Sequence, residues 1–583
     1  MSLPPRRLFA AAFLLAAVYA CGSDAADPPD ARRGGSGGED DTFRPVGGTG
    51  GKKTSGGGAG AGGEAITAGG LAGAAGSPTS SAGSGGGGVS GMAGSAPKTS
   101  PPSSKDLTGV TTLQKRRLPV HAVSPKAEGK NPSNFNNLPG YFEDGWGEIK
   151  DAPGEAHLSR TLDTTAPPPP GPNPKRLSRF VHLAVLQVVD DESPQRFANL
   201  DDTLWPSARP QDPYLCQMAN ASVRSIRSVH AKDPVDFVLL GGDNAENGLE
   251  NELSWVMSIF NGKQTVNCDS GDDDDLIPGP ANDGKDPFFA EGLGIPWKWV
   301  SGNHDMLVAG NYPPNAMQRM IALGEDAPNG TRVYTSGGAI TSGNGVAVKD
   351  ASRVLLDRSS FLDIVKKDGD GHGLGQAQVD SGYANYTFDV AGTPLRFIVL
   401  DFTSAVGGAE GLLRVKERDG FVKPALDKAK KDGKWVILSS HHATASMTKS
   451  GGIPPIPQSD AVLPADYLKL VSGYDNVLFS MVGHSHEHVV RAVGAEGGHQ
   501  WWEVMTSAIA DFPHQFRTIE ITDQDNGWVT LKATCVDFAI DDDPVAAEGY
   551  RRGVIDYTTG HLPPPRLGEP SDRNVELWAR KPK

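Results

Sequence analysis

The sequence is poor in cysteine and in basic residues, and its N-terminal apolar run is short. It has 583 residues and only four cysteines, too few for a scaffold held together by several disulfides. It has 55 lysines and arginines against 70 aspartates and glutamates, and the net charge of -15 argues against a nonspecific nucleic-acid binder. The apolar run at residues 8–18 is too short to span a bilayer as a mature helix. The composition therefore indicates an acidic chain with a soluble surface.

Large apolar residues are also scarce in the first quarter of the chain, where glycine dominates. The 73 glycines are most concentrated between Gly22 and Gly94, in runs with serine and alanine that cannot bury enough apolar surface to offset the entropy of the chain. We therefore expect a disordered, flexible linker over residues 22–125. A proline-rich surface segment is predicted over 126–178, one large folded domain over 179–545, and a C-terminal extension over 546–583.

Residues 1–21 are predicted to be a signal peptide for export. Arg6 and Arg7 precede the apolar run, which ends in Val-Tyr-Ala-Cys at residues 18–21 and there resembles the lipobox of bacterial lipoproteins. That resemblance implies that Cys21 is acylated and becomes the new N-terminus, whereas an ordinary cleavage site near Cys21 is the alternative. We expect an exported protein of the bacterial cell envelope, attached to the membrane through its lipid on the periplasmic or cell-surface side.

The cysteines allow one disulfide at most. If Cys21 is lipidated, only Cys216, Cys268 and Cys535 remain. We expect Cys216 to pair with Cys268, although separation in sequence does not decide separation in space.

Apolar runs alternate with helical candidates from residue 179 onward, which is typical of an α/β fold. Strands are expected at 179–189, 235–240, 297–300, 395–400, 435–438 and 477–482, and helices at 212–231, 251–260 and 417–431. The segment 501–535 is expected to complete a second sheet. Polar residues directly follow several of these strands, and open α/β sheets place their ligand sites at the carboxyl ends of strands.

Four short motifs contain residue types that bind divalent metals. They are Gly-Gly-Asp-Asn at 241–244, Gly-Asn-His-Asp at 302–305, Ser-His-His at 440–442 and Gly-His-Ser-His-Glu-His at 483–488. Histidine nitrogen, aspartate oxygen and the asparagine carbonyl suit Zn, Mn or Fe. A single residue of this kind is more often structural, but four motifs at strand ends predict that distant loops converge on a metal.

In this order the motifs resemble the calcineurin-like metallophosphoesterase superfamily, and the resemblance spans residues 179–490. It implies a four-layer α/β/β/α sandwich of mixed sheets, and hydrolysis of phosphomonoesters or phosphodiesters by a metal-bound hydroxide. The implied cofactors are divalent Mn, Zn or Fe ions. The resemblance assigns Asp243 to bridge two metals, with Asn303, His441 and His484 completing the second site and His486 serving the first.

Two residues of the second motif have implied roles in catalysis rather than in metal binding. The resemblance places His304 beside the scissile phosphate, where it stabilises charge or protonates the leaving oxygen, and Asp305 orients or charges it. His442 competes with His441 for the metal. We expect His442 to point elsewhere, because residues at a strand end alternate in direction.

The first block of the family pattern, Asp-x-His after the first strand, is altered. Aligning the strand puts Val185 at the aspartate position and Gln187 at the histidine position. Valine cannot ligate a metal and the neutral glutamine carbonyl is a weaker donor than imidazole, so the first site is expected to be weak or empty. One ion is therefore expected, and a second would need Gln187 or a rescue ligand from Asp190, Asp191 or His182.

Three functions remain open at this point. A phosphoesterase of weakened activity is favoured, because His304, Asp305 and the full second-site set occur together. The alternatives are a non-catalytic module that binds a phosphorylated ligand and an envelope interaction protein. The expected substrate is a phosphorylated small molecule or lipid, since a bound dication can reverse the local field that a small anion meets.

Two other segments are interpreted as structural. The aspartate-rich residues 269–275 lack the central glycine and terminal glutamate of an EF-hand loop, so a solvated acidic insertion is expected there. Residues 511–517 are expected to form a strand and turn without a catalytic role.

Overall fold

The computed structural model describes residues 103–104, 110–201, 207–273, 284–332, 334, 338–341, 343–541, 543–561 and 566–582. The predicted signal peptide, Cys21 and residues 22–102 of the predicted linker lie outside these ranges. Among the described helices, none combines the length and the apolar character that a membrane crossing requires.

The first sheet carries the N-terminal group of site loops. Its strands follow the order β4 (Leu158–Thr161), β22 (Val575–Arg580), β21 (Trp528–Asp537), β20 (Gln515–Asp523), β5 (Lys175–Leu183), β6 (Phe237–Leu240) and β9 (Trp297–Lys298), with β1 (Val110–Thr111) paired to β21. β5, β6 and β9 are parallel, whereas β20 is antiparallel to both β5 and β21. The loops after β5, β6 and β9 therefore leave the same edge of the sheet.

The second sheet carries the C-terminal group of site loops. Its order is β12 (Tyr386–Asp389), β13 (Leu395–Leu400), β14 (Trp435–Ser440), β17 (Val477–Val482), β19 (Trp501–Met505) and β18 (Val489–Val493). The four central strands are parallel, and β12 and β18 form antiparallel edges. The parallel strands are almost wholly buried and read as continuous apolar runs, as expected for strands covered on both faces.

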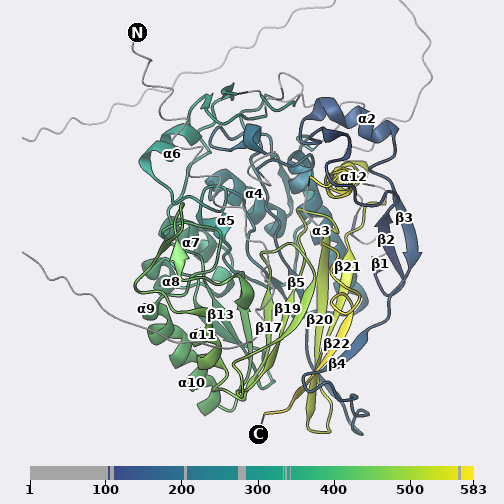
Figure 1. The fold of residues 1–583 in the computed structure, drawn as a ribbon, viewed down its shortest axis with the longest axis vertical. Coiled ribbons are helices and arrows are strands. Elements are labelled where there is room, and N and C mark those ends of the chain that lie inside the picture. The colour runs from purple at the N-terminus through teal and green to yellow at the C-terminus, as the bar shows by residue number, and fades with distance from the viewer. Residues whose placement is uncertain are drawn as a thin grey trace, which may run out of the picture. The chain divides into compact units, whose positions relative to one another are not determined.

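Aromatic rings fill the space between the two sheets. Phe180 and Phe237 of the first sheet stack on each other, and both meet Phe397 of the second sheet edge to face at 5.4 Å. On the outer side of the second sheet, Ile398 and Val436 pack in one cluster with residues of α10 (Lys423–Lys431) and α11 (Pro464–Val471). In Figure 1 these helices lie to the left of β13 and β17, while β20–β22 lie to the right.

Helices α3 (Leu215–Lys232), α4 (Glu250–Asn261) and α12 (Pro544–Thr558) share a buried apolar cluster with the first sheet. The shorter helices are α2 (Leu138–Glu143), α5 (Asn303–Met306), α6 (Ala316–Ala322), α7 (Arg358–Lys367), α8 (Gln376–Ser381) and α9 (Val415–Glu417). Small two-stranded ladders pair β2 (Lys115–Pro119) with β3 (Ile149–Pro153), β7 (Gln264–Val266) with β8 (Phe288–Ala290), β10 (Asp326–Ala327) with β11 (Gly345–Val346), and β15 (Ser450–Gly451) with β16 (Ile456–Pro457). Helices outside two mixed sheets confirm the predicted α/β/β/α sandwich.

Two predicted boundaries are wrong. The linker was predicted to run to residue 125, but β1 and β2 lie within it, and Thr112 Oγ1 donates to the carbonyl of Cys535 at 3.0 Å. The predicted extension 546–583 holds most of α12 and all of β22, which lies inside the first sheet. Proline and charge near these segments masked short strands whose partners are distant in sequence.

Two strand predictions also need correction. The run at 179–189 was expected to be one strand, but β5 ends at Leu183 because the chain turns through left-handed conformations at Val185 and Gln187. The segment 501–535 was assigned to one sheet, whereas β19 joins the second sheet and β20 and β21 join the first.

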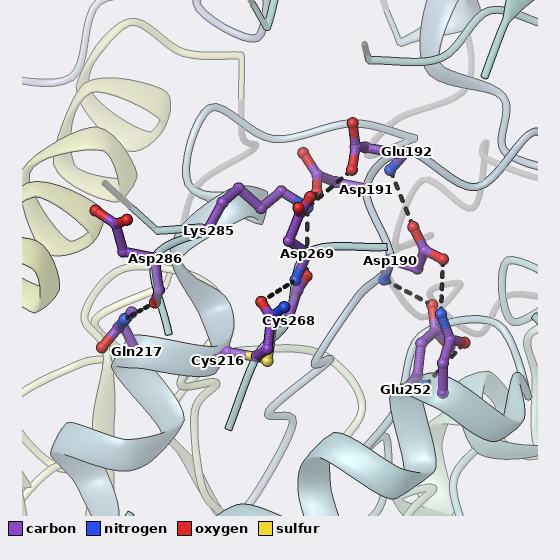
Figure 2. The surroundings of a disulfide bond; sticks show 12 residues. Asp190, Asp191, Glu192, Cys216, Gln217, Glu252, Cys268, Asp269, Lys285 and Asp286 are labelled. Carbon is purple, nitrogen blue, oxygen red and sulfur yellow. Dashed lines mark hydrogen bonds and ion pairs between the residues drawn. A yellow bond between two sulfur atoms is a disulfide. The ribbon is translucent and has the colours of Figure 1, made fainter. Parts of the chain in front are cut away.

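The predicted disulfide between Cys216 and Cys268 is confirmed, and it ties α3 to the segment after β7. Figure 2 shows this bond with Asp269 and Lys285 beside it. Asp269 is only 6% exposed, so the expectation of a solvated acidic insertion is wrong at this residue, whereas Asp272 of the same segment is exposed. The buried Lys285 ammonium lies 2.6 Å from Asp191 and 3.4 Å from Glu192, and its positive charge offsets the negative charge of these two carboxylates.

Candidate metal centre

Five loops meet where the strands of the two sheets end. They follow β5, β6 and β9 of the first sheet and β14 and β17 of the second. Backbone hydrogen bonds tie them together: Val185 N donates to Gly242 O at 3.0 Å, and Gly483 N donates to His441 O at 2.8 Å. The convergence of distant loops that the motifs predict is therefore present.

Five loop positions have a left-handed backbone. The φ angles are 54° at Val185, 43° at Gln187, 54° at Asp243, 77° at His484 and 57° at His486. Such angles are uncommon outside glycine, and each costs about 1–3 kcal/mol. They recur at the positions where the family pattern has ligands, including the two where this chain has valine and glutamine.

The predicted second-site ligands are held with their donor atoms toward one another. His441 Nδ1 donates to Gly241 O at 2.7 Å, which leaves Nε2 facing Asp243 Oδ2 at 2.9 Å. Asn303 Nδ2 donates to Gly310 O at 3.0 Å, so the amide carbonyl is the free end. Within the described residues, Asn303 Oδ1 is buried without a hydrogen-bond partner, and Asp243 Oδ2 and His441 Nε2 are buried with only each other as partners.

His442 lies in the same group, contrary to the expectation that it points elsewhere. Its Nε2 donates to Ala409 O at 2.8 Å, and its Nδ1 is buried without a hydrogen-bond partner among the described residues. One ligand-type nitrogen from each of His441, His442 and His484 lies within 4.8 Å of the others. The alternation argument failed because β14 ends at Ser440, before the two histidines.

This donor set fits a divalent transition metal. Imidazole nitrogens, one carboxylate and one amide carbonyl are borderline ligands that suit Zn, Mn or Fe. Burial opposes ionisation of Asp243, but the imidazoles of His441 and His304 outweigh it and hold the pKa of this carboxyl far below its usual range. The carboxylate is therefore ionised, as a ligand must be.

The residues at the first-metal position do not fit a cation in the same way. Val185 packs in an apolar cluster with Ala184 and Ala508. Gln187 is fully buried, and its Oε1 accepts a hydrogen bond from Arg209 Nη2 at 2.7 Å. His486 donates from Nδ1 to Asp511 Oδ2 at 2.5 Å, which leaves its Nε2 as the only predicted imidazole ligand there.

Each of the three suggested rescue ligands has a buried partner of its own. Asp190 pairs with Arg353 at 2.7 Å, and Asp191 pairs with Lys285. His182 Nδ1 shares a hydrogen bond of 2.7 Å with Thr506 Oγ1. These side chains are already engaged in buried interactions of their own.

His304 and Asp305 do not form the predicted pair. Asp305 accepts hydrogen bonds from the backbone N–H groups of Asp243 and Gly302 at 3.0 and 2.8 Å. The carboxylate near His304 is instead that of Glu246, 3.3 Å from Nδ1, and Nδ1 also donates to the Glu246 carbonyl at 3.0 Å. Asp305 thus fastens two loops together, and Glu246 is the acidic neighbour of the histidine.

The environment of His304 favours its protonated form. Burial lowers the pKa of this imidazole, but Glu246 and Asp243 outweigh burial and raise the pKa to about 9. The side chain is 17% exposed, so it reaches solvent from the edge of the ligand group.

Three residues of the site were missed by sequence reasoning. Glu246 lies three positions after Asp243 in the same loop, and that proximity was a usable signal. Asp511 belongs to the segment interpreted as structural, but its carboxylate fixes His486. Arg209 lies in no motif, and the sequence carries no signal for it.

Comparisons with known proteins give distant likenesses in structure. No protein-family model matches the chain, and no curated protein sequence matches it. A dimetal phosphatase from Danio rerio is 11% identical with a TM-score of 0.34, and the match covers 63% of this chain and 100% of that one. A purple acid phosphatase from yellow lupin is 12% identical with a TM-score of 0.26, over 66% of this chain and 54% of that one. The GAP50 anchor of the inner membrane complex of Plasmodium is 12% identical with a TM-score of 0.26, over 65% of this chain and 95% of that one.

Asp243, Asn303, His441 and His484 meet where five strands of two packed sheets end, and His304 lies at their edge. In the order and placement of these motifs, and in its α/β/β/α architecture, the chain resembles the calcineurin-like metallophosphoesterases.

Proposed function

We propose that the protein is a metal-dependent phosphoesterase whose cation is held by Asp243, Asn303, His441 and His484, with His442 as a further nitrogen donor. The observation that carries this proposal is a group of buried ligand-type atoms: Asn303 Oδ1 has no hydrogen-bond partner among the described residues, and Asp243 Oδ2 and His441 Nε2 have only each other at 2.9 Å. Unpaired buried polar atoms cost free energy, and a bound cation would remove that cost.

The chain's own residues support hydrolysis of a phosphoester. When bound, a divalent cation would polarise a phosphoryl oxygen and stabilise the negative charge that develops there. The bonds of Asn303 to Gly310 and of His441 to Gly241 fix the ligands in advance, so little reorganisation is needed. His304, partly exposed and held at Nδ1 by Glu246, is placed to pass a proton to the leaving oxygen.

The test is an assay of the full chain with p-nitrophenyl phosphate and bis-p-nitrophenyl phosphate in the presence of Mn²⁺, Zn²⁺ or Fe²⁺. Asp243→Asn and His441→Gln should each lower kcat/KM at least about 100-fold and reduce bound metal, because each removes a ligand. His121→Gln, a partly exposed histidine outside the site, is the matched control and should leave both unchanged. Absence of turnover with every metal would reject the phosphoesterase and favour a non-catalytic binding module.

We infer further that the protein is exported and anchored by a lipid at Cys21, where it meets a phosphorylated small molecule or lipid. The disulfide between Cys216 and Cys268 supports an oxidising compartment. In bacterial cells fed a labelled fatty acid, the wild-type protein should carry the label and sediment with membranes. Cys21→Ser should lose the label and become soluble, and a Cys21→Ser protein that still carried the label would refute the anchor.

A further inference from the structure

A buried arginine contacts residues that surround the expected first-cation position. The Arg209 side chain is 1% exposed, and its Nη2 donates to Oε1 of Gln187 at 2.7 Å. Gln187 occupies the position of the expected histidine ligand, with its backbone N donating to Asp243 O at 2.8 Å. The one oxygen that the altered block offers a metal is thus already bound to a guanidinium.

The same guanidinium is joined to His486, the remaining imidazole of the first-metal set. Arg209 Nε lies 2.9 Å from Asp511 Oδ1, and the other oxygen of Asp511 accepts from His486 Nδ1 at 2.5 Å. Asp511 therefore links the guanidinium to the imidazole. Besides the bridging Asp243, the two side chains that could serve a first cation, Gln187 and His486, are thus connected to Arg209.

Arg209 also reaches the acidic neighbour of His304. Its Nη1 is 3.9 Å from Glu246 Oε2, and the same oxygen is 3.3 Å from His304 Nδ1. The positive charge thus lies among the carboxylates of Asp511 and Glu246, where a metal would otherwise be needed to neutralise them. A buried charge is tolerated only with partners of this kind.

The guanidinium keeps its charge in this position. Burial lowers the pKa of Arg209, but Asp511, Glu246 and Asp212 outweigh burial and raise the pKa above its ordinary value. A dication brought next to a buried positive charge is repelled, and little water is present to screen the repulsion. The Arg209 guanidinium therefore disfavours a cation beside Gln187.

We propose that this chain carries one metal site instead of two, and that the Arg209 guanidinium takes the place of the first cation. The inference rests on the proposed function, in which the cation is held at the Asp243, His441 and His484 side of the centre. Arg209 acts as a positioning residue, because it holds Gln187 and, through Asp511, His486. The altered Asp-x-His block and the arginine together form an alternative to a second metal.

The experiment is a metal count on the full chain, which needs no turnover. After loading with Mn²⁺ and gel filtration, wild-type protein should hold one ion per chain by elemental analysis. The double variant Val185→Asp with Gln187→His should still hold one, because Arg209 remains. Adding Arg209→Met should raise the count to two, whereas two ions in the wild type or in the double variant would overturn the inference.

A neighbouring arginine provides the matched control. Arg196 is buried and pairs with Asp212 at 2.7 Å, and no hydrogen bond joins it to Gln187 within the described residues. The double variant carrying Arg196→Met in place of Arg209→Met should hold one ion. A second ion there would show that any lost positive charge suffices, and it would refute the specific role of Arg209.

The electron paramagnetic resonance spectrum of Mn²⁺-loaded wild type keeps the inference falsifiable if the triple variant does not fold. An isolated-ion spectrum is expected, and an exchange-coupled pair would contradict it. Failure of the proposed function and failure of this inference give different results. One bound ion without turnover would reject the phosphoesterase function and leave the single-site inference intact. Two bound ions with turnover would reject the single-site inference and support the phosphoesterase function. Protein that binds no ion under any condition would overturn both.

Discussion

Replacing Asp305 by asparagine should lower the stability of the folded protein, and not only its activity. The carboxylate receives four backbone hydrogen bonds: Oδ1 accepts from Asn244 and Ala245 at 2.9 and 3.0 Å, and Oδ2 accepts from Asp243 and Gly302 at 3.0 and 2.8 Å. Asp305 is fully buried, so water cannot replace these bonds. This one side chain fastens the loop after β6 to the loop after β9.

The magnitude follows from counting donors. In Asp305→Asn an NH₂ group replaces one carboxylate oxygen. In either orientation of the amide, this NH₂ group faces two backbone N–H donors that it cannot accept from. The NH₂ group should replace Oδ1 and face the N–H groups of Asn244 and Ala245. The other position is less favourable because Oδ2 also accepts a third hydrogen bond, from Asn244 Nδ2 at 3.2 Å. Each buried donor left unpaired costs about 1–3 kcal/mol, so the free energy of unfolding should fall by about 2–6 kcal/mol.

Urea unfolding of wild type and variant, followed by tryptophan fluorescence, measures this loss. The control is Asp460→Asn, which alters a carboxylate that is 48% exposed and paired with Arg414 at 2.7 Å, and it should change stability by less than about 1 kcal/mol. If Asp305→Asn unfolds at the wild-type midpoint but loses phosphatase activity, Asp305 serves His304 as the sequence suggested. The loop-fastening argument would then be refuted.

Three further predictions concern stability. In Gly553→Ala, the added Cβ would lie 2.0 Å from His514 Nε2, so α12 must shift and thermal unfolding should show a loss of about 1–3 kcal/mol; an unchanged Tm would contradict this. Burial raises the pKa of Asp537 from 3.8 to about 6, so the folded state keeps a proton that the unfolded state releases, and stability falls as pH rises between these values. Asp537→Asn should remove roughly 3 kcal/mol of that pH dependence, and parallel urea curves of both proteins at pH 4 and pH 7 test it. Replacing Cys216 and Cys268 by serine opens a loop with a sequence separation of 52 and should cost about 2–4 kcal/mol, and a variant as resistant to urea as the wild type would exclude a stabilising disulfide.

Much of the fold can be predicted from local patterns. Leu395–Leu400 and Val477–Val482 are strands within the predicted bounds, because buried parallel strands are continuous apolar runs between turn signals. β22 was missed because its place depends on pairing with β4 and β21, and pairing between distant segments leaves no local signal. The contribution of residues 110–119 was missed for the same reason.

The site divides in the same way. Asp243, Asn303 and His441 are recognisable because ligand residue types occur in short motifs after strands. Arg209 could not be predicted, since an isolated arginine has meaning there only through Gln187 and Asp511, which other elements bring to it. Asp305 was placed correctly in its loop, but which backbone groups a carboxylate binds is decided by tertiary packing.

The left-handed turns at Val185 and Gln187 bear on how this centre can evolve. The main chain already turns at the two positions of the Asp-x-His pattern, so installing that ligand pair asks for new side chains and no rebuilt loop. On the proposal above, aspartate at 185 or histidine at 187 would not bind a cation while the Arg209 guanidinium is present. Replacing Arg209 first would leave the buried carboxylates of Asp511 and Glu246 without its positive charge. On the proposed role of Arg209, residues 185, 187 and 209 have to change together before a second cation can bind.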